Sequence, residues 1–225
     1  MGEGTGGYRA GARIGLSLAT GTFLLAVTFG AQARQADWGA VAPVVASLAV
    51  FSGSAQFTLL TALAGAGAAW AAVASACLIN LRFLPMSLAV APWLRGGRLR
   101  RALEAQTLVD ASFVVAHVGG DRFDRERLMG ATAPQWLAWV SGTAVGVFAA
   151  PPERLEYALG LDVVFPVFFV VLLLDELGTT PSAWRAGLLG GVLTAMLLLV
   201  LPPGLALLGG AGAALLGLTD RQEGR

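Results

Sequence analysis

The chain has 225 residues, of which 56% are hydrophobic and only 13% charged, and its formal net charge is +1. A soluble domain carries about 25% charged residues, so this composition predicts an integral protein of the lipid bilayer. The near-neutral charge excludes the acidic or basic bulk that would draw the chain to nucleic acid. A single cysteine and a single histidine exclude a disulfide framework and a paired-histidine metal site, and we expect no metal and no cofactor.

Apolar segments occupy most of the chain. We predict an all-α fold, a polytopic membrane helix bundle of about seven spans with broken helices. In it, residues 1–13 form a cytoplasmic tail, 14–218 the transmembrane domain and 219–225 a polar tail. The predicted apolar segments are 14–31, 40–51, 57–69, 71–94, 106–119, 130–149, 158–174, 187–201 and 204–218. The count is approximate because 106–119 is short and the last two segments form either a hairpin or two short spans.

The first helix break is predicted in the middle of a long stretch, residues 38–81, that contains no acidic or basic residue. Small or hydrogen-bonding side chains stand there where a spanning helix would prefer leucine: Ser52, Gly53, Ser54 and Gln56. A backbone that opens in lipid needs a polar partner or a cavity. These residues are therefore candidates to bind a polar ligand, or they only tie the break to a neighbouring helix.

The second break is predicted in the segment 71–94, which carries Asn80, Arg82 and Pro85. Proline lacks the N–H of the helical ladder, and its ring pushes against the carbonyl of Leu81. A kink there is expected to bare that carbonyl beside a cation and an amide. Arg82 is a candidate to bind a carboxylate. The alternative is a side chain that extends to the membrane surface, with Asn80 as a simple cap.

Basic residues on both sides of the early spans predict their orientation. Arg9 and Arg13 precede the first span, which we expect to be a retained helix, and four arginines follow the fourth within 95–101. Both ends are therefore expected on the cytoplasmic side. The charge-alternating residues 121–127 are interpreted as a solvated connection, and the Gly142-x-x-x-Gly146 spacing as a helix-packing motif of low specificity.

Ionisable residues inside a membrane are costly and point to function. Asp162 lies four residues before Pro166, which places a carboxylate and a free carbonyl together, a pair suited to an ammonium group or a proton; the alternative is a helix cap. Asp110 and His117 are seven apart, on one face if that segment is helical, and are candidates for proton coupling. The alternative is a helix lying partly in water with both groups solvated.

Several motifs, taken in order, resemble the AzlC family, the large subunit of two-component branched-chain amino-acid permeases. They are Phe51-Ser-Gly-Ser-Ala-Gln-Phe57, Asn80-Leu-Arg-Phe83, Ser87-Leu-Ala-Val-Ala-Pro92, Val109-Asp-Ala-Ser-Phe113, Trp136 with the two glycines of the packing motif, and Leu159-Gly-Leu-Asp162 with Phe165-Pro-Val-Phe168. The resemblance covers residues 14 to about 201. The chain departs from it at Phe83 and Ala111, where the family often has His and Glu.

The resemblance implies export of branched-chain amino acids, and of methionine, through the bacterial cytoplasmic membrane by a secondary, proton-coupled mechanism, with a small hydrophobic AzlD-type partner. Without a phosphate-binding Gly-Lys-Ser or Gly-Lys-Thr loop, an ion gradient is the expected energy source. A zwitterion with an aliphatic side chain needs an anion site, a cation site and an apolar pocket. Arg82 or the Ser-Gly-Ser amides are expected to serve its carboxylate, Asp162 its ammonium, and Phe51, Phe57 and Phe165 its side chain.

Two alternatives remain at this point. A membrane-embedded enzyme acting on lipid or isoprenoid would gather Asp110, His117 and the 121–127 segment at an aqueous interface, although no nucleophile–base set is visible. A scaffold subunit that does not transport would pack the Ser-Gly-Ser break shut. A possible internal repeat, from the likeness of residues 48–52 to 161–166, would favour a transporter.

Overall fold

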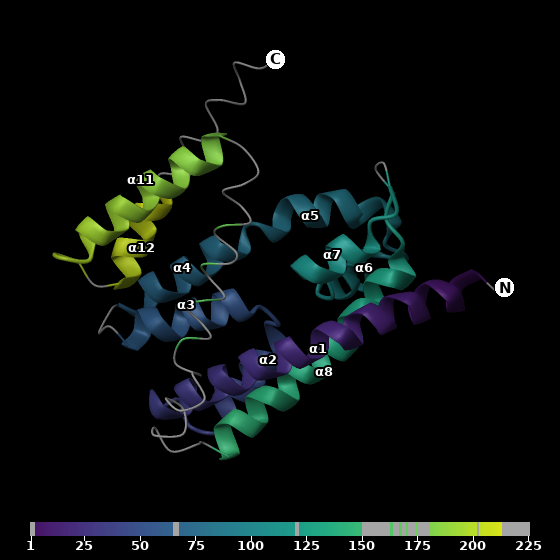
Figure 1. Ribbon diagram of the computed structural model, residues 1–225, viewed down its shortest axis with the longest axis horizontal. Coiled ribbons are helices and arrows are strands. Elements are labelled where there is room, and N and C mark those ends of the chain that lie inside the picture. Colours follow the sequence, from purple (N-terminus) through teal and green to yellow (C-terminus); the bar gives the residue numbers. More distant parts are fainter. Residues whose placement is uncertain are drawn as a thin grey trace. The chain divides into compact units, whose positions relative to one another are not determined.

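The computed structural model describes residues 3–64, 68–119, 122–149, 181–201 and 203–212, together with Val163, Val167, Val170 and Leu174. Its named elements are all helices: α1 Glu3–Gln35, α2 Val41–Ala49, α3 Gly53–Ala64, α4 Ala69–Asn80, α5 Phe83–Val90, the 3₁₀ turn η1 Ala91–Trp93, α6 Arg98–Ala105, α7 Asp110–Ala116, α8 Arg125–Ala149, α11 Pro181–Leu197 and α12 Pro203–Ala211 (Figure 1). Within these ranges there is no β-strand, only one isolated β-bridge between His117 and Phe123, so the predicted all-α class is confirmed.

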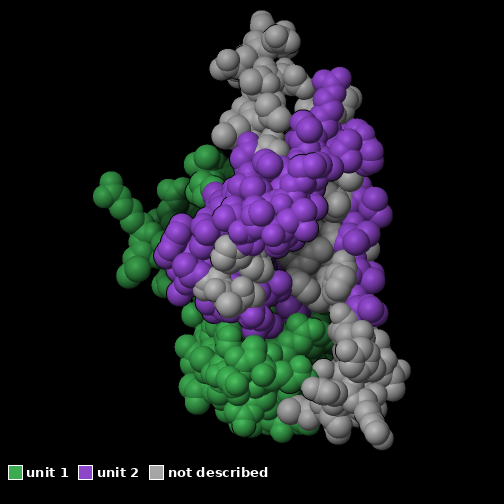
Figure 2. Space-filling model, turned by 90° about the vertical axis from the view of Figure 1, so that its left-hand side faces the viewer, with its two compact units in different colours: residues 1–53, 80–152 green, residues 54–79, 153–225 purple. Residues whose placement is uncertain are grey.

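The chain forms two compact units, coloured separately in Figure 2. Unit 1 comprises Met1–Gly53 and Asn80–Pro152, and unit 2 comprises Ser54–Ile79 and Glu153–Arg225. Both helix breaks predicted from the sequence lie where the chain passes from one unit to the other. Each unit is considered by itself below.

Unit 1 is built on the close pairing of α1 with α8, which lie side by side in Figure 1. A side chain at Gly142 or Gly146 would collide with the carbonyls of Phe23 and Val27, so these two turns of α8 approach the backbone of α1 directly. The Gly142-x-x-x-Gly146 spacing is therefore a packing motif here, as predicted. Small residues permit such approaches between helices in a membrane.

The α1–α8 pair is parallel. Gly130 faces Tyr8 and Gly146 faces Val27, so residue numbers rise together along both helices, and Gly7 lies against Asp124 at their common start. The arginine-rich ends of both helices consequently share one end of unit 1. The cytoplasmic placement of Arg9, Arg13 and residues 95–101 remains a prediction.

The N-terminal part of α1 shows how packing overrides local preference. Residues 1–13 were expected to form a separate tail, yet the helix begins at Glu3. Glycine lowers helix propensity by about 1 kcal/mol. Here, however, Gly11 and Gly15 meet the carbonyls of Arg127 and Ala131 on α8, where a larger side chain would collide. The glycines that weaken the isolated helix are the residues that let it pack.

The apolar segments are divided more finely than predicted. Among the described residues, one helix, from Gly6 to Gln35, is long and apolar enough to cross a membrane. Ala69–Asn80 and Phe83–Trp93 pass the same test only together, and they are bent by 41°. A span needs about 20 residues, and α2, α3 and α5 have 9, 12 and 8. Seven spans and the internal repeat remain predictions.

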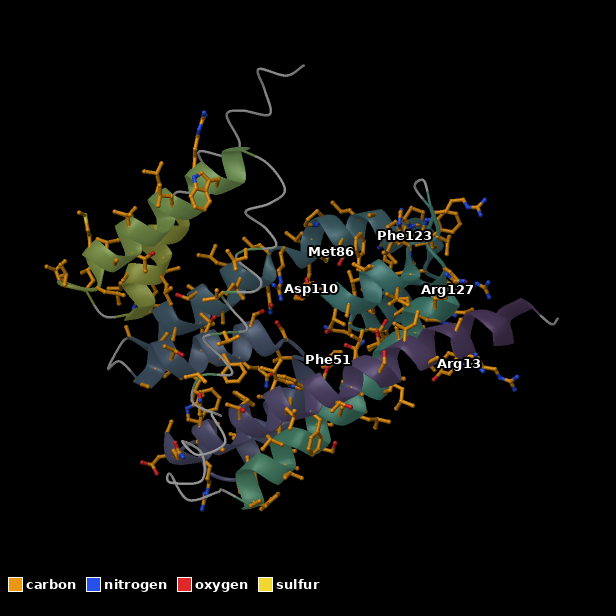
Figure 3. All side chains as sticks on the ribbon, in the orientation of Figure 1. Arg13, Phe51, Met86, Asp110, Phe123 and Arg127 are labelled. Carbon is orange, nitrogen blue, oxygen red and sulfur yellow. The ribbon has the colours of Figure 1, made fainter. Side chains whose placement is uncertain are left out.

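The segment 106–119 is not a span in its own right. Its helix, α7, has 7 residues, or about 10 Å at 1.5 Å per residue, against about 30 Å of hydrocarbon. It packs against α8 beside a buried apolar cluster that includes Phe123 and against which Met86 of α5 packs; both residues are labelled in Figure 3. The remaining members of that cluster are Val90, Leu108, Ala116 and Leu128, with Leu94 and Phe113 against it.

In unit 2, α11 and α12 form a hairpin, one of the two forms predicted for this region. Gly209 lies against Leu197, and Gly210 lies against Thr194 and the carbonyl of Gly190, so residue numbers run in opposite directions along the two helices. They are therefore antiparallel. Glycines again occur where the helices are closest.

Candidate functional site

The first helix break lies between α2 and α3 at Phe51. Its φ of +42° falls in the left-handed region, where a residue with a side chain is uncommon and signals a fixed turn. Ser52 is buried, and α3 begins at Gly53. A Cβ at Gly53 would lie 2.8 Å from Cη2 of Trp139 on α8. The break is present where predicted, and Trp139, which the sequence did not single out, requires the glycine.

The second break separates α4 from α5 at Leu81 and Arg82. The predicted kink is confirmed by the 41° bend between the helices. The predicted bare carbonyl is wrong, because the N–H of Leu84 donates a 3.0 Å hydrogen bond to the oxygen of Leu81. The chain tightens to a three-residue turn ahead of Pro85 and thereby satisfies the carbonyl.

One hydrogen bond joins the two breaks. The hydroxyl of Ser52 donates to Oδ1 of Asn80 over 2.7 Å. Ser52 belongs to the turn after α2, and Asn80 is the last residue of α4. Two residues predicted as ligand-binding are thus brought together, and each helps to hold the other's break.

An ion pair extends this contact toward α7. Nη2 of Arg82 lies 2.9 Å from Oδ2 of Asp110, with the two side chains 32% and 43% exposed. The guanidinium carbon of Arg82 also lies 5.0 Å from the ring centroid of Phe83, within cation–π range. The predicted carboxylate site at Arg82 therefore holds a carboxylate of the chain itself. We call Ser52, Asn80, Arg82 and Asp110 the polar assembly.

His117 does not join the polar assembly. Helix α7 ends at Ala116, and His117 has an extended backbone that bridges to Phe123, with the two rings 5.4 Å apart. The prediction that Asp110 and His117 share one helix face is wrong because the helix is too short to include both. They lie at opposite ends of α7, at Asp110 and just after Ala116.

Of the other predicted site residues, two are buried in the structure and two lie outside the described residues. Ser54 and Gln56 are buried in the first turn of α3, and their role toward a ligand remains a prediction. Asp162 and Phe165 lie outside the described residues. Among the residues the structure does describe, no group of three or more His, Cys, Asp or Glu side chains is placed to hold a metal ion.

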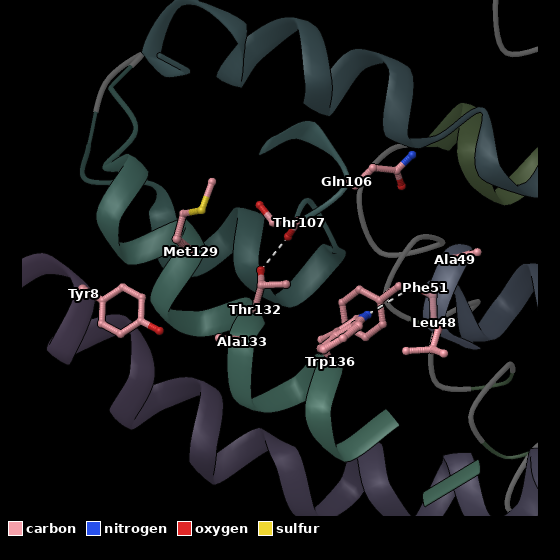
Figure 4. Close-up of a pocket in the computed structure, with 10 residues that line it drawn as sticks. All are labelled: Tyr8, Leu48, Ala49, Phe51, Gln106, Thr107, Met129, Thr132, Ala133 and Trp136. Carbon is pink, nitrogen blue, oxygen red and sulfur yellow. Dashed lines mark hydrogen bonds between the residues drawn. The ribbon is translucent and has the colours of Figure 1, made fainter. Parts of the chain in front are cut away.

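A pocket of about 310 Å³ adjoins the first break in unit 1. Figure 4 shows its lining: Tyr8, Leu48, Ala49, Phe51, Gln106, Thr107, Met129, Thr132, Ala133 and Trp136. The indole N–H of Trp136 donates to the backbone carbonyl of Leu48 over 3.4 Å, and the hydroxyl of Thr132 donates to the backbone carbonyl of Thr107. The lining is mainly apolar with a few hydroxyl and amide groups, the mixture typical of small-molecule pockets.

The pocket and the polar assembly are neighbours along the chain. Phe51 lines the pocket and the next residue, Ser52, belongs to the polar assembly; Thr107 lines the pocket three residues before Asp110. The pocket and the polar assembly therefore share two stretches of the chain, at residues 51–52 and 107–110.

A second cluster of charges surrounds Glu104 at the end of α6. Nε of Arg125 donates to Glu104 over 2.8 Å, and the Arg95 backbone N–H and the Arg100 side chain donate over 3.1 and 3.2 Å. The hydrogen bond from Arg125 lowers the pKa of Glu104 to about 2, although burial opposes the shift. Glu104 in turn raises the pKa of Arg125.

The interpretation of residues 121–127 as a solvated connection is therefore wrong for Arg125, whereas Arg122 is exposed and Asp121 lies outside the described residues. Arg125 is 15% exposed and fixes the start of α8 to α6. The carboxylate of Asp124 accepts the N–H groups of Glu126 and Arg127 over 2.9 and 3.1 Å and so caps α8. Alternating charges indicate a solvated loop only when their partners are local, and here the main partner comes from another helix.

We expect Glu104→Gln to lower the free energy of unfolding by about 2 kcal/mol at pH 7, because a buried guanidinium loses a charged hydrogen-bond partner. The folded-state pKa of Glu104 lies below its ordinary value of 4.5, so this stabilisation is complete above about pH 4.5 and is lost as the pH falls toward 2. Thermal unfolding in detergent measures it. Glu126→Gln, at a more exposed pair with Arg125, serves as control and should cost under about 1 kcal/mol. Equal shifts in both variants would contradict the prediction.

Taken together, a chain built only of helices in its described ranges, with interrupted apolar helices and a polar assembly at their breaks, belongs to the class of helical membrane proteins. Residues 17–151 match the family model described as AzlC protein, and the chain belongs to the AzlC family. It is 33% identical over 158 residues to an uncharacterized membrane protein of Archaeoglobus fulgidus, covering 68% of each chain.

A second relative carries a functional name. The chain is 22% identical over 159 residues to the branched-chain amino acid transport protein AzlC of Bacillus subtilis, covering 69% of this chain and 62% of the relative. No solved structure matches. The resemblance drawn from the motifs is thereby confirmed at the level of the family.

Proposed function

We propose that this protein is a secondary transporter that exports branched-chain amino acids, and methionine, across the bacterial cytoplasmic membrane, coupled to protons and together with a small AzlD-type subunit. The observation that carries the proposal is the polar assembly, in which an arginine and an aspartate lie at the junction of two interrupted helices. Interrupted helices are where many secondary transporters hold their substrates. The family and the name of the Bacillus subtilis relative support the substrate class.

In this proposal, Arg82 receives the substrate carboxylate and Asp162 its ammonium group. The pocket lined by Phe51 and Trp136 takes the aliphatic side chain, since its volume of about 310 Å³ suits a small branched group. Asp110, His117 and Asp162 are the candidates for proton coupling. Ser52, Gly53, Ser54, Gln56 and Asn80 shape the break, and Phe165 adds to the apolar surface.

Counterflow of labelled leucine, valine and methionine in proteoliposomes tests the proposal, with and without the small subunit. We expect labelled leucine to accumulate in vesicles preloaded with unlabelled leucine, valine or methionine, and not in vesicles preloaded with glutamate. If no branched-chain amino acid exchanges under either condition, the proposed function is wrong.

A specific prediction concerns Asp162, for which the support is the sequence alone. Asp162→Asn is expected to reduce proton-driven leucine flux at least tenfold while the protein remains folded, because an amide neither carries the proton nor balances an ammonium group. Asp37→Asn, in the exposed turn after α1, is the matched control and should retain full flux. Unimpaired flux in the Asp162 variant would remove that residue from the mechanism.

One observation favours the scaffold alternative. The first break is closely packed, with Gly53 against Trp139 and Ser52, Ser54 and Gln56 buried. A transporter is also packed here while it is closed, so the two functions differ in behaviour rather than in this conformation. Counterflow by the chain in the absence of any partner would exclude the scaffold function.

A further inference from the structure

The cation site of the proposed function is already occupied by a carboxylate. Arg82 is joined to Asp110 over 2.9 Å, and Asp110 comes from a different helix, α7. Resting on the proposed function, we propose that Asp110 is an internal competitor for the substrate carboxylate. It holds Arg82 while no amino acid is bound, and the carboxylate of the arriving substrate takes its place.

The exposure of the pair makes this exchange energetically feasible. The Arg82 and Asp110 side chains are 32% and 43% exposed, so the chain leaves part of each group open to an approaching ligand, and ion pairs that are not enclosed by the protein are weak. A carboxylate with further contacts elsewhere in the site can displace a partner held this weakly. The contrast is the Glu104–Arg125 pair, whose side chains are 7% and 15% exposed. That pair is buried, and we assign it a fixed structural role.

Displacement of Asp110 also breaks the contact between the α4–α5 break and α7. Arg82 stands in the break between α4 and α5, and Asp110 is the first residue of α7. The ion pair therefore ties a kinked helix to the start of a two-turn helix. Substrate binding would replace the Arg82–Asp110 ion pair by a contact between Arg82 and the ligand. The ligand would therefore have a higher affinity for the conformation in which the ion pair is broken than for the one in which it is formed. Such a difference is what a ligand needs to shift a conformational equilibrium.

The test compares three ligands that share the leucine side chain: leucine, 4-methylpentanoate, which lacks the amino group, and 3-methylbutylamine, which lacks the carboxylate. Affinities are measured for the wild-type protein, Asp110→Asn and the control Asp37→Asn, with the small subunit present if the wild type requires it. We expect Asp110→Asn to bind leucine and 4-methylpentanoate about two- to fivefold more tightly, the fold-change that corresponds to loss of an exposed ion pair. The amine should not bind more tightly, and the control should match the wild type.

A second measurement does not depend on the variant being stable. Hydrogen exchange of the wild-type backbone is followed with and without leucine. We expect peptides covering residues 109–116 to exchange faster when leucine is bound, because α7 has lost its tie to Arg82. A purely structural ion pair predicts unchanged or slower exchange in this segment.

The outcomes separate the two proposals. Unchanged or weaker leucine affinity in a folded Asp110→Asn protein overturns the competition, and if that variant does not fold, unchanged or slower exchange of residues 109–116 overturns it. Wild-type binding of leucine in either case leaves the proposed function standing. Failure of the wild type to bind leucine, valine or methionine removes the proposed function and the competition with it.

Discussion

Gly146→Leu is expected to prevent accumulation of folded protein, with a loss of at least about 4 kcal/mol. Any Cβ at this position would collide with the carbonyl oxygen of Val27 and lie 2.8 Å from the backbone nitrogen of Ala31. Main-chain atoms cannot turn aside as a flexible side chain can, so α1 and α8 would have to separate. The yield of monodisperse protein by size exclusion in detergent, followed by thermal unfolding, measures the effect.

The chain offers a matched control for this variant. Gly21 lies in α1 with nothing within 4 Å of the position of a Cβ, so Gly21→Leu should be stable, or more stable by about 0.5–1 kcal/mol from helix propensity. Gly30→Leu, on α1 against the carbonyl of Thr143, should fail like Gly146→Leu. Normal folding of both Gly146→Leu and Gly30→Leu would show that the helices do not approach this closely.

The second large effect is expected at Arg82. Arg82→Gln should weaken leucine binding about 10- to 100-fold, because a charged hydrogen bond to a carboxylate contributes about 1.5–3 kcal/mol. The exposed Arg98 of α6 provides the control, and Arg98→Gln should leave binding unchanged. Leucine affinity from the ligand-induced rise in unfolding temperature measures both.

Substitutions of Arg82 and Asp110 are expected to change leucine affinity in opposite directions, although the two residues form one ion pair. Loss of Arg82 removes the group that binds the substrate, whereas loss of Asp110 removes its competitor. If the ion pair only stabilised the fold, Arg82→Gln and Asp110→Asn would weaken leucine binding by similar amounts. Full leucine affinity in a folded Arg82→Gln protein would remove Arg82 from the site.

Local chemistry in the sequence was sufficient to locate both helix breaks. Ser52 and Gly53 interrupt an apolar run, and Pro85 cannot complete the helical ladder, so each signal acts within a few residues of its effect. The polar assembly could not be predicted in this way. Nothing in the spacing of Arg82 and Asp110, or of Glu104 and Arg125, predicts that they meet, because each pair joins separate elements.

The sequence by itself determined that this is an all-helical membrane protein of the AzlC family with interrupted helices, because composition, proline and small polar residues act locally. The tertiary structure alone decided which partners those breaks have. It placed Ser52 on Asn80, Asp110 on Arg82 and the ring of Trp139 against Gly53. It also extended α1 through glycines that disfavour a helix, since contact with α8 outweighs propensity wherever two backbones touch.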